Sequence, residues 1–160
     1  MDLKSMNTFQ TLQQFAKSRQ AIRDTLAKLS PEELTQPQVE GVWTVKDILG
    51  HLTSWEEVCL IPLRGFAQCG NFQSEVIEES TWNDRQAARK QAIPLPEIIA
   101  EWEKIHAEFV DTLQKLPENL WQQQISLPWG EKGNCFTMVN GLAWHEGEHL
   151  QFIQKLVKNR

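Results

Sequence analysis

The 160-residue chain contains no tyrosine and only three cysteines, Cys59, Cys69 and Cys135. An odd number of cysteines with no repeated spacing argues against a disulfide framework, and the absence of a C-x-x-C pair removes the usual cysteine-based zinc motif. Disulfides are rare in reducing compartments. We therefore expect three reduced thiols in a cytosolic protein.

Long apolar runs and clusters of basic residues are also missing. No apolar stretch approaches membrane-spanning length, and the polar, charge-broken start from Met1 to Gln14 is not typical of a signal peptide. The formal net charge is −5, which disfavours nucleic acid because binding phosphates requires clustered lysine and arginine. We expect a soluble cytoplasmic protein that binds a small molecule, with neither nucleic acid nor a membrane as its partner.

What remains is an ordinary globular composition with an unusual choice of aromatic residue. Apolar residues make up 41% and charged residues 23% of the chain, a balance that favours a folded over a disordered protein. Residues 1–160 amount to one domain, which is long enough to bury a core. The seven tryptophans, large rings without a hydroxyl, suit either a thick core or an apolar pocket.

Apolar residues recur at helical spacing in several segments. We expect long helices at about residues 8–29, 44–63, 94–116 and 136–158. Shorter helices are expected after Ser30 and at 82–92, and Pro62 should kink or end the second long helix. The first stripe is interrupted only at Arg19, and residues 118–135 indicate a loop with a short extended stretch. Four amphipathic helices predict an all-α four-helix bundle with long connections and short extra helices, in which an up-down-up-down order is not forced.

Two of the four histidines, His145 and His149, lie four residues apart on the last of these helices. This spacing puts both imidazoles on one helix face, where they can hold one divalent metal if another element supplies a third ligand. His51 lies between Ile48 and Trp55 on an inward face and is the candidate. Three neutral protein ligands with an open position are typical of a catalytic site. Zinc, nickel and iron all suit imidazole, and the sequence does not choose among them.

Residues near this pair are candidates for the surroundings of the metal. Glu146 and Glu148 lie about 80° to either side of the histidine midline and could orient a ligand or accept a proton. Gly141, one turn earlier, should leave room for a substrate, and Trp55 and Trp144 are candidates for lining a pocket. The alternatives are that the glutamates are solvated helix flanks and the tryptophans core residues. No catalytic residue is identified.

Other reactive side chains have ordinary explanations. His106 stands next to apolar residues and is expected to be a satisfied core side chain, and Cys59 a buried structural thiol. Arg85, Arg89 and Lys90 could neutralise the carboxylates of a thiol cofactor. A solvated helix face explains these three cations more simply.

The segment from His145 to His149 also matches H-E-x-x-H, in which Glu146 would be the general base of a zinc peptidase. Such peptidases place a strand beside the motif helix, and this sequence contains no convincing sheet. Glu148 also puts a charge where that motif normally has an uncharged residue. The peptidase therefore ranks below a metal site within a bundle.

Two segments resemble the DinB-like superfamily: residues 41–56, GVWTVKDILGHLTSWE, and residues 145–150, HEGEHL. Members of that family have W-[S/T]-x-[K/R]-[D/E]-[I/L]-L-x-H-L on the second long helix and H-x-x-x-H on the last. The likeness spans nearly the whole chain in helix order. It implies a four-helix bundle, often a dimer, with a metal held by one histidine of the second helix and two of the last. Those roles correspond to His51, His145 and His149.

The resemblance also implies a range of activities. Characterised members include metal-dependent transferases that use bacillithiol, mycothiol or glutathione, a thiol-dependent isomerase and toxin-resistance hydrolases. We therefore expect an enzyme whose divalent metal activates a thiol or water, with a low-molecular-weight-thiol S-transferase ahead of a hydrolase. The alternative is a non-catalytic metal-binding or stress-response bundle. Residues 65–135 match no family motif, and substrate contacts are expected there.

Overall fold

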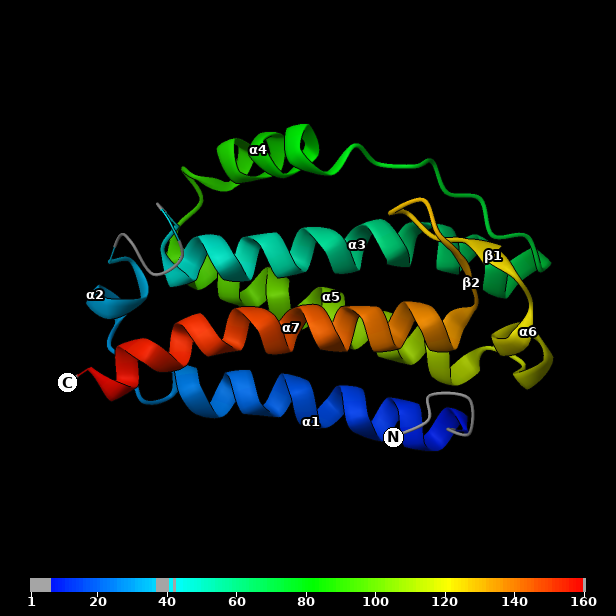
Figure 1. Ribbon diagram of the computed structural model, residues 1–160, viewed down its shortest axis with the longest axis horizontal. Coiled ribbons are helices and arrows are strands. Elements are labelled where there is room, and N and C mark those ends of the chain that lie inside the picture. The colour runs from blue at the N-terminus through cyan, green and yellow to red at the C-terminus, as the bar shows by residue number, and fades with distance from the viewer. Residues whose placement is uncertain (1–6, 37–40, 42, 160) are drawn as a thin grey trace.

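The computed structural model describes residues 7–36, 41 and 43–159. The first six residues, and Val42 of the motif quoted above, lie outside this range. Four long helices form the bundle in Figure 1: α1 (Thr8–Leu26), α3 (Val45–Cys69), α5 (Leu95–Lys115) and α7 (Cys135–Lys158). The predicted all-α four-helix bundle is confirmed. None of the described helices is long and apolar enough to cross a membrane.

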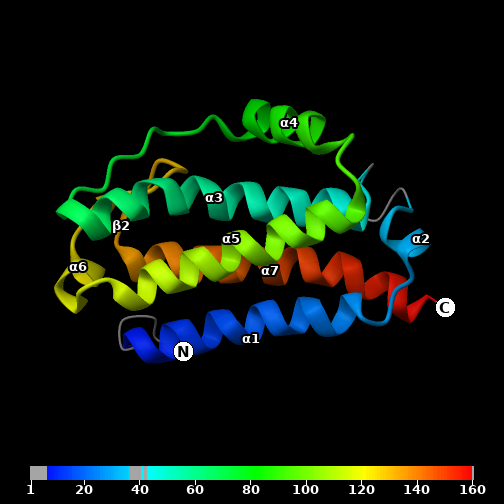
Figure 2. The ribbon, with the colours of Figure 1, turned by 180° about the vertical axis from the view of Figure 1, so that it is seen from behind.

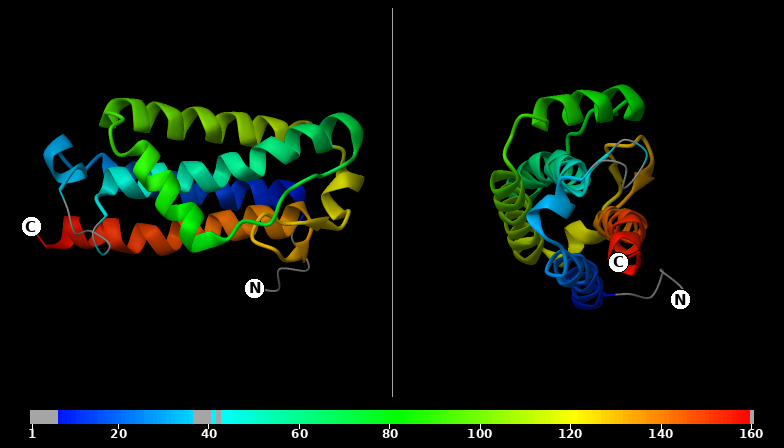
Figure 3. Two further views of the ribbon diagram at one scale, coloured as in Figure 1. Left: turned by 90° about the horizontal axis from the view of Figure 1, so that it is seen from above. Right: turned by 90° about the vertical axis from the view of Figure 1, so that its left-hand side faces the viewer.

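The four helices do not follow an up-down-up-down order. Helices α1 and α7 run in one direction along the bundle, whereas α3 and α5 run in the other (Figures 1 and 2). Helix α3 packs chiefly against α5, and α1 against α7, so the closest partners are parallel. A parallel pair requires a long return connection. Residues 70–94 provide it, and they include α4 (Glu79–Lys90), which lies on the outer side of α3 (Figure 3).

Shorter elements close the two ends of the bundle. Helix α2 (Pro31–Leu34) follows α1, and α6 (Glu118–Gln122) follows α5. The antiparallel pair β1 (Ile125–Ser126) and β2 (Lys132–Gly133) then leads directly into α7. These two strands correspond to the short extended stretch expected in the loop region.

Helices α3 and α7 begin at side-chain caps. The backbone amide of Asp47 donates to Thr44 Oγ1 at 3.0 Å, and the amide of Thr44 donates back to Asp47 Oδ2 at 2.9 Å. Asn134 caps α7 by accepting from the amide of Thr137 at 3.0 Å. Such caps satisfy amides that have no partner within the helix. They therefore define where each helix starts.

Pro62 does not end α3, because the helix continues to Cys69 and stops at Gly70, whose φ is +70°. A proline inside a helix costs about 3 kcal/mol through one lost hydrogen bond and a steric clash. The following turns carry Leu63 and Phe66, both fully buried in the core. Their burial offsets the cost of the proline.

Buried polar residues form a layer across the bundle between two apolar clusters. On α1, Phe15 belongs to one cluster and Ile22 to the other, with Arg19 between them. On α7, Leu142 belongs to the same cluster as Phe15, and Ile153 belongs to the same cluster as Ile22. The layer consists of side chains from all four long helices: Arg19, His51, Glu56, His106, Glu146 and His149.

Candidate metal centre

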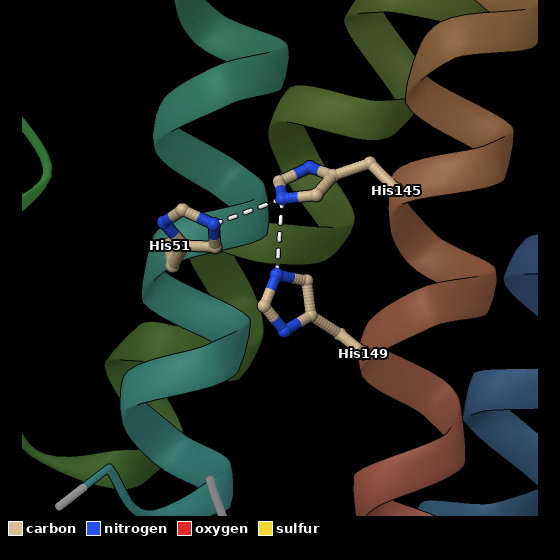
Figure 4. A group of neighbouring side chains, drawn as sticks. All are labelled: His51, His145 and His149. Carbon is tan, nitrogen blue, oxygen red and sulfur yellow. Dashed lines mark hydrogen bonds between the residues drawn. The ribbon is translucent and has the colours of Figure 1, made fainter. Parts of the chain in front are cut away.

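The structure brings the three predicted histidines together. His51 projects from α3, and His145 and His149 project from α7 (Figure 4). The Nε2 atom of His145 lies 2.9 Å from Nε2 of His51 and 3.0 Å from Nε2 of His149. One ring nitrogen from each residue lies within 4.8 Å of the other two. Side chains 94 positions apart in the sequence thus meet at one point.

The donor set fits a divalent metal. A tetrahedral zinc ion with Zn–N bonds of about 2.0–2.1 Å separates its nitrogen ligands by about 3.3 Å, close to the shorter spacings found here. Burial, reinforced by the neighbouring imidazoles, lowers the pKa of His51 to about 2. Burial and the adjacent His149 lower the pKa of His145 to about 4. Both rings are therefore neutral near pH 7, which is the form that binds metals.

A buried ion network lies next to the histidines. Arg19 of α1 donates from Nη2 to Glu56 of α3 at 2.7 Å and from Nε to Glu146 of α7 at 2.8 Å. Its guanidinium also lies 4.3 Å from the ring centre of Trp102 on α5. Glu56 is five residues after His51, and Glu146 adjoins His145. The network thus ties the two histidine-bearing helices together at the level of the cluster.

The sequence signalled this network only in part. Arg19 stood out as the one charged residue in an apolar stripe, which suggests a buried partner because an unpaired buried charge is very unfavourable. Its partners Glu56 and Glu146 lie 37 and 127 residues away. Helical periodicity cannot match residues across such distances.

The two glutamates that flank the histidine pair have different surroundings. Glu146 is 3% exposed and belongs to the Arg19 network, and burial raises the pKa of its carboxyl despite the nearby guanidinium. Glu148 is exposed and accepts a hydrogen bond from Gln151 at 3.3 Å. Of the two, Glu148 matches the solvated alternative and Glu146 does not.

A cavity of about 370 Å³ opens beside the histidine cluster. All three predicted pocket residues, Trp55, Gly141 and Trp144, line it. Sequence reasoning missed the remaining lining residues, which surround it together with His145: Glu79, Trp129, Glu131, Thr137 and Leu142. Several of these come from residues 65–135, the region in which we expected substrate contacts.

The room beside Gly141 is taken up by a side chain of the protein itself, the indole of Trp129. A Cβ atom at this position would lie 3.2 Å from Cζ2 of Trp129. The absent side chain therefore allows the indole of Trp129 to pack directly against α7. The space predicted beside the histidines lies next to this indole, with Gly141 as part of its wall.

Other predicted side chains have clear surroundings. His106 is buried, its Nδ1 atom 2.7 Å from Glu56 Oε1 and its ring in edge contact with Phe15, so the prediction of a satisfied core histidine is confirmed. Cys59 is a fully buried free thiol, as expected. The prediction of a solvated Lys90 is wrong. That side chain is 5% exposed because its methylenes pack against the bare backbone of Gly50. Its ammonium group forms an ion pair with Glu101.

The zinc-peptidase alternative finds little support in the geometry. Its general base would be Glu146, whose carboxylate is bound by Arg19 in the core. In the described part of the chain, the sheet consists of β1 and β2 alone, and each strand has two residues.

Comparisons with known proteins bear on the family and the fold of this chain. The sequence profile described as the DinB superfamily matches residues 14–153. A protein of Geobacillus thermodenitrificans (strain NG80-2), named provisionally a metal-dependent hydrolase, is 23% identical over 141 residues. That alignment covers 88% of this chain and 78% of the relative.

Solved structures share the fold at low sequence identity. The mycothiol-dependent maleylpyruvate isomerase superposes with a TM-score of 0.81 at 11% identity, covering 96% of this chain but only 63% of the isomerase. YfiT from Bacillus subtilis, also assigned provisionally to the metal-dependent hydrolases, gives 0.72 at 15% identity and covers 97% and 90% of the two chains. The colibactin self-resistance protein ClbS, solved with double-stranded DNA, gives 0.76 at 14% identity, covering 94% and 95%. The profile match extends over most of the bundle, and this chain belongs to the DinB superfamily.

Proposed function

We propose that His51, His145 and His149 hold one divalent metal ion and that the protein is a metal-dependent enzyme acting on a small molecule. The convergence of three Nε2 atoms from two helices carries this proposal. Three protein ligands leave at least one position for a reactant. A metal held in this way lowers the pKa of water or a thiol and polarises a carbonyl.

The residues around the cluster keep its ligands in place. Trp43 packs against the ring of His51, with centroids 4.8 Å apart. Arg19 joins α3 to α7 through two buried carboxylates, Glu56 and Glu146, and so fixes the spacing between His51 and His145. Such support holds ligands in a productive geometry before a reactant arrives.

The charge of the cavity favours water over a carboxylate-bearing thiol as the activated group. Glu79 and Glu131 line the cavity. None of Arg85, Arg89 and Lys90, the cations considered for a thiol cofactor, is among the described residues that line it. A tripeptide thiol such as glutathione carries two carboxylates and one ammonium group, so its net charge near pH 7 is negative and these glutamates would repel it on balance. We therefore place hydrolysis ahead of thiol transfer, reversing the order expected from the sequence.

A thiol without carboxylates is the second candidate. The isomerase with the same fold is named for its dependence on mycothiol, a sugar thiol that lacks carboxylates. Such a thiol would enter the acidic cavity without repulsion. If it did, the metal would activate sulfur in place of water.

Assays on chelated and reloaded protein test the two candidates. Protein reloaded with zinc, nickel or iron is offered chromogenic esters and amides, and separately an electrophile with glutathione or mycothiol. We expect metal-dependent hydrolysis that is lost in His149→Ala and no conjugation of glutathione. Conjugation without hydrolysis would make the protein a transferase. The absence of both reactions with every metal would instead support the non-catalytic metal-binding bundle.

Three further expectations stay predictions: a single domain over residues 1–160, a cytoplasmic location and a homodimer. ClbS was solved in complex with double-stranded DNA, and we do not carry that partner over to this chain. For this chain, whose net charge is −5, we propose a small-molecule substrate.

A further inference from the structure

Aromatic rings and carboxylates dominate the cavity beside His145. Trp55, Trp129 and Trp144 supply its large side chains, and Glu79 and Glu131 supply its charge. Among the described residues, no lysine or arginine lines this cavity. The neighbouring cation Lys132 donates to the hydroxyl of Ser126 at 2.7 Å. The charged groups that line the cavity are thus both acidic.

The tryptophan rings stand at steep angles to one another. The ring centroids of Trp55 and Trp129 lie 6.4 Å apart with the planes inclined by 63°. The indole N–H of Trp129 donates to Glu131 at 3.1 Å, and that of Trp55 donates to Asn83 at 3.0 Å. The electropositive N–H edges of both indoles are therefore bound to the protein. Trp55 is 5% exposed and its ring centroid lies 4.7 Å from that of Trp82. The more exposed rings of Trp129 and Trp144 therefore offer their electronegative faces to a ligand.

Trp144 gives an independent sign of a ligand. This residue lines the cavity and is 68% exposed, which is unusual for so large an apolar side chain. It directly precedes His145, one of the proposed metal ligands. A molecule in the cavity that covered its indole would remove this apolar surface from water.

We propose that this cavity binds an organic cation, a small molecule carrying an ammonium or substituted amine. Aromatic faces combined with carboxylates are the chemistry that recognises such groups, because both attract positive charge and the rings also bury the attached methyl or methylene groups. The cavity volume, about 370 Å³, falls within the range of small-molecule sites, roughly 300–1,000 Å³. The cationic group contacts the tryptophans and the two glutamates, and the uncharged part of the molecule extends toward His145.

The proposal names the substrate class of the proposed enzyme and rests on that function for the reaction, but binding of the cation does not require the metal. It also excludes polycarboxylate ligands. A dicarboxylate would meet Glu79 and Glu131 with like charge and no compensating cation in the cavity wall.

Two matched probes test the charge requirement. Choline and 3,3-dimethylbutan-1-ol have nearly the same shape, but the quaternary nitrogen of choline is replaced by carbon in the alcohol. Binding is followed through the indole N–H signals of ¹⁵N-labelled protein, with those of Trp55 and Trp129 assigned by substitution with phenylalanine. We expect choline to bind at least about tenfold more tightly than the alcohol and to shift these two signals. Equal affinity for the two probes would overturn the proposal.

Substitution of the carboxylates provides the second test. Glu79→Gln combined with Glu131→Gln should reduce choline affinity to near that of the alcohol while leaving the alcohol's own affinity unchanged. Glu97→Gln, which removes one negative charge from an exposed position at the start of α5, should leave choline binding intact. A double variant that binds choline as well as the wild type would contradict the proposal.

The same titration separates this proposal from the proposed function. It is carried out on chelated protein and on metal-loaded protein. Choline binding without metal uptake would overturn the function and keep the cation site, whereas metal uptake without choline binding would do the reverse.

Discussion

His145 occupies the centre of the histidine cluster. Its Nε2 atom lies within 3.0 Å of the Nε2 atoms of both His51 and His149. A proton added to His51 or His145 places positive charge among close neighbours in a buried environment. These two rings are therefore favoured in the neutral form, which is the form that binds a metal.

We predict that the metal-free protein loses stability as the pH falls below about 6.5. Histidine in the unfolded chain titrates near that value, whereas burial lowers the pKa of His51 to about 2 and that of His145 to about 4. Between about pH 6.5 and 4 the unfolded chain therefore binds more protons than the folded one. Each of the two residues then removes up to about 1.4 kcal/mol of unfolding free energy per pH unit.

Urea unfolding of chelated protein between pH 7.5 and 5 measures this dependence. His51→Gln should make it shallower, because a group that takes up a proton on unfolding has been removed. A pH dependence unchanged in that variant would show that His51 is not buried as a neutral ring.

Replacing Arg19 should destabilise the protein much more than replacing Arg23 one turn later on the same helix. Arg19→Met leaves Glu56 and Glu146 buried without their cation, which typically costs about 3–5 kcal/mol. Arg23 pairs with Glu103 at 2.6 Å, but these side chains are 37% and 39% exposed, so Arg23→Met should cost at most about 1 kcal/mol. Urea unfolding at pH 7 compares the two variants. Similar losses would contradict the account of a buried network around Arg19.

At the scale of elements, α7 provides a matched pair of interior glycines. A Cβ atom at Gly147 would meet nothing within 4 Å, so Gly147→Ala should stabilise the protein by up to about 1 kcal/mol through helix propensity. A Cβ atom at Gly141 would lie 3.2 Å from the indole of Trp129 and force it to move. Gly141→Ala should therefore gain less or lose stability, with a change in tryptophan fluorescence. Equal stabilisation without a spectral change would mean that Trp129 does not pack on α7.

Local patterns predicted the elements that depend on near neighbours. The spacing of His145 and His149 follows from one helical turn, and helix starts such as that at Thr44 follow from capping within three residues. The cavity was harder to predict, because Trp129 reaches α7 from the loop after β1. That contact depends on how the chain returns to the bundle. The one local sign of it was Gly141 itself, at a helix position that disfavours glycine.

At the scale of the whole molecule, the proposed metal would join two helices from different halves of the sequence. His51 lies on α3 and the other two ligands on α7, across a polar layer that lacks the apolar packing found above and below it. The four long helices followed from periodicity, whereas α6 (Glu118–Gln122), in a region predicted to be a loop, and the parallel pairing of α3 with α5 did not. That pairing depends on the path of residues 70–94. The apolar periodicity of this segment is too weak to predict where it lies against the bundle.

Metal removal should therefore lower thermal stability. A ligand that binds only the folded state stabilises it by about 2.7 kcal/mol when present at 100 times its dissociation constant. Chelation should lower the melting temperature, and zinc or nickel should restore it. His149→Ala should melt at the same temperature with and without chelator. An equal response to chelator in that variant would place the stabilising metal elsewhere.

The metal content of purified, tag-free protein tests the central claim most directly. Elemental analysis by mass spectrometry is applied to the wild type, to His51→Gln, and to His106→Gln as a control that removes a buried histidine outside the cluster. The account predicts near-stoichiometric zinc, nickel or iron in the wild type and in His106→Gln, and a large loss in His51→Gln. Full metal content in His51→Gln, or none in the wild type even after reconstitution, would contradict it.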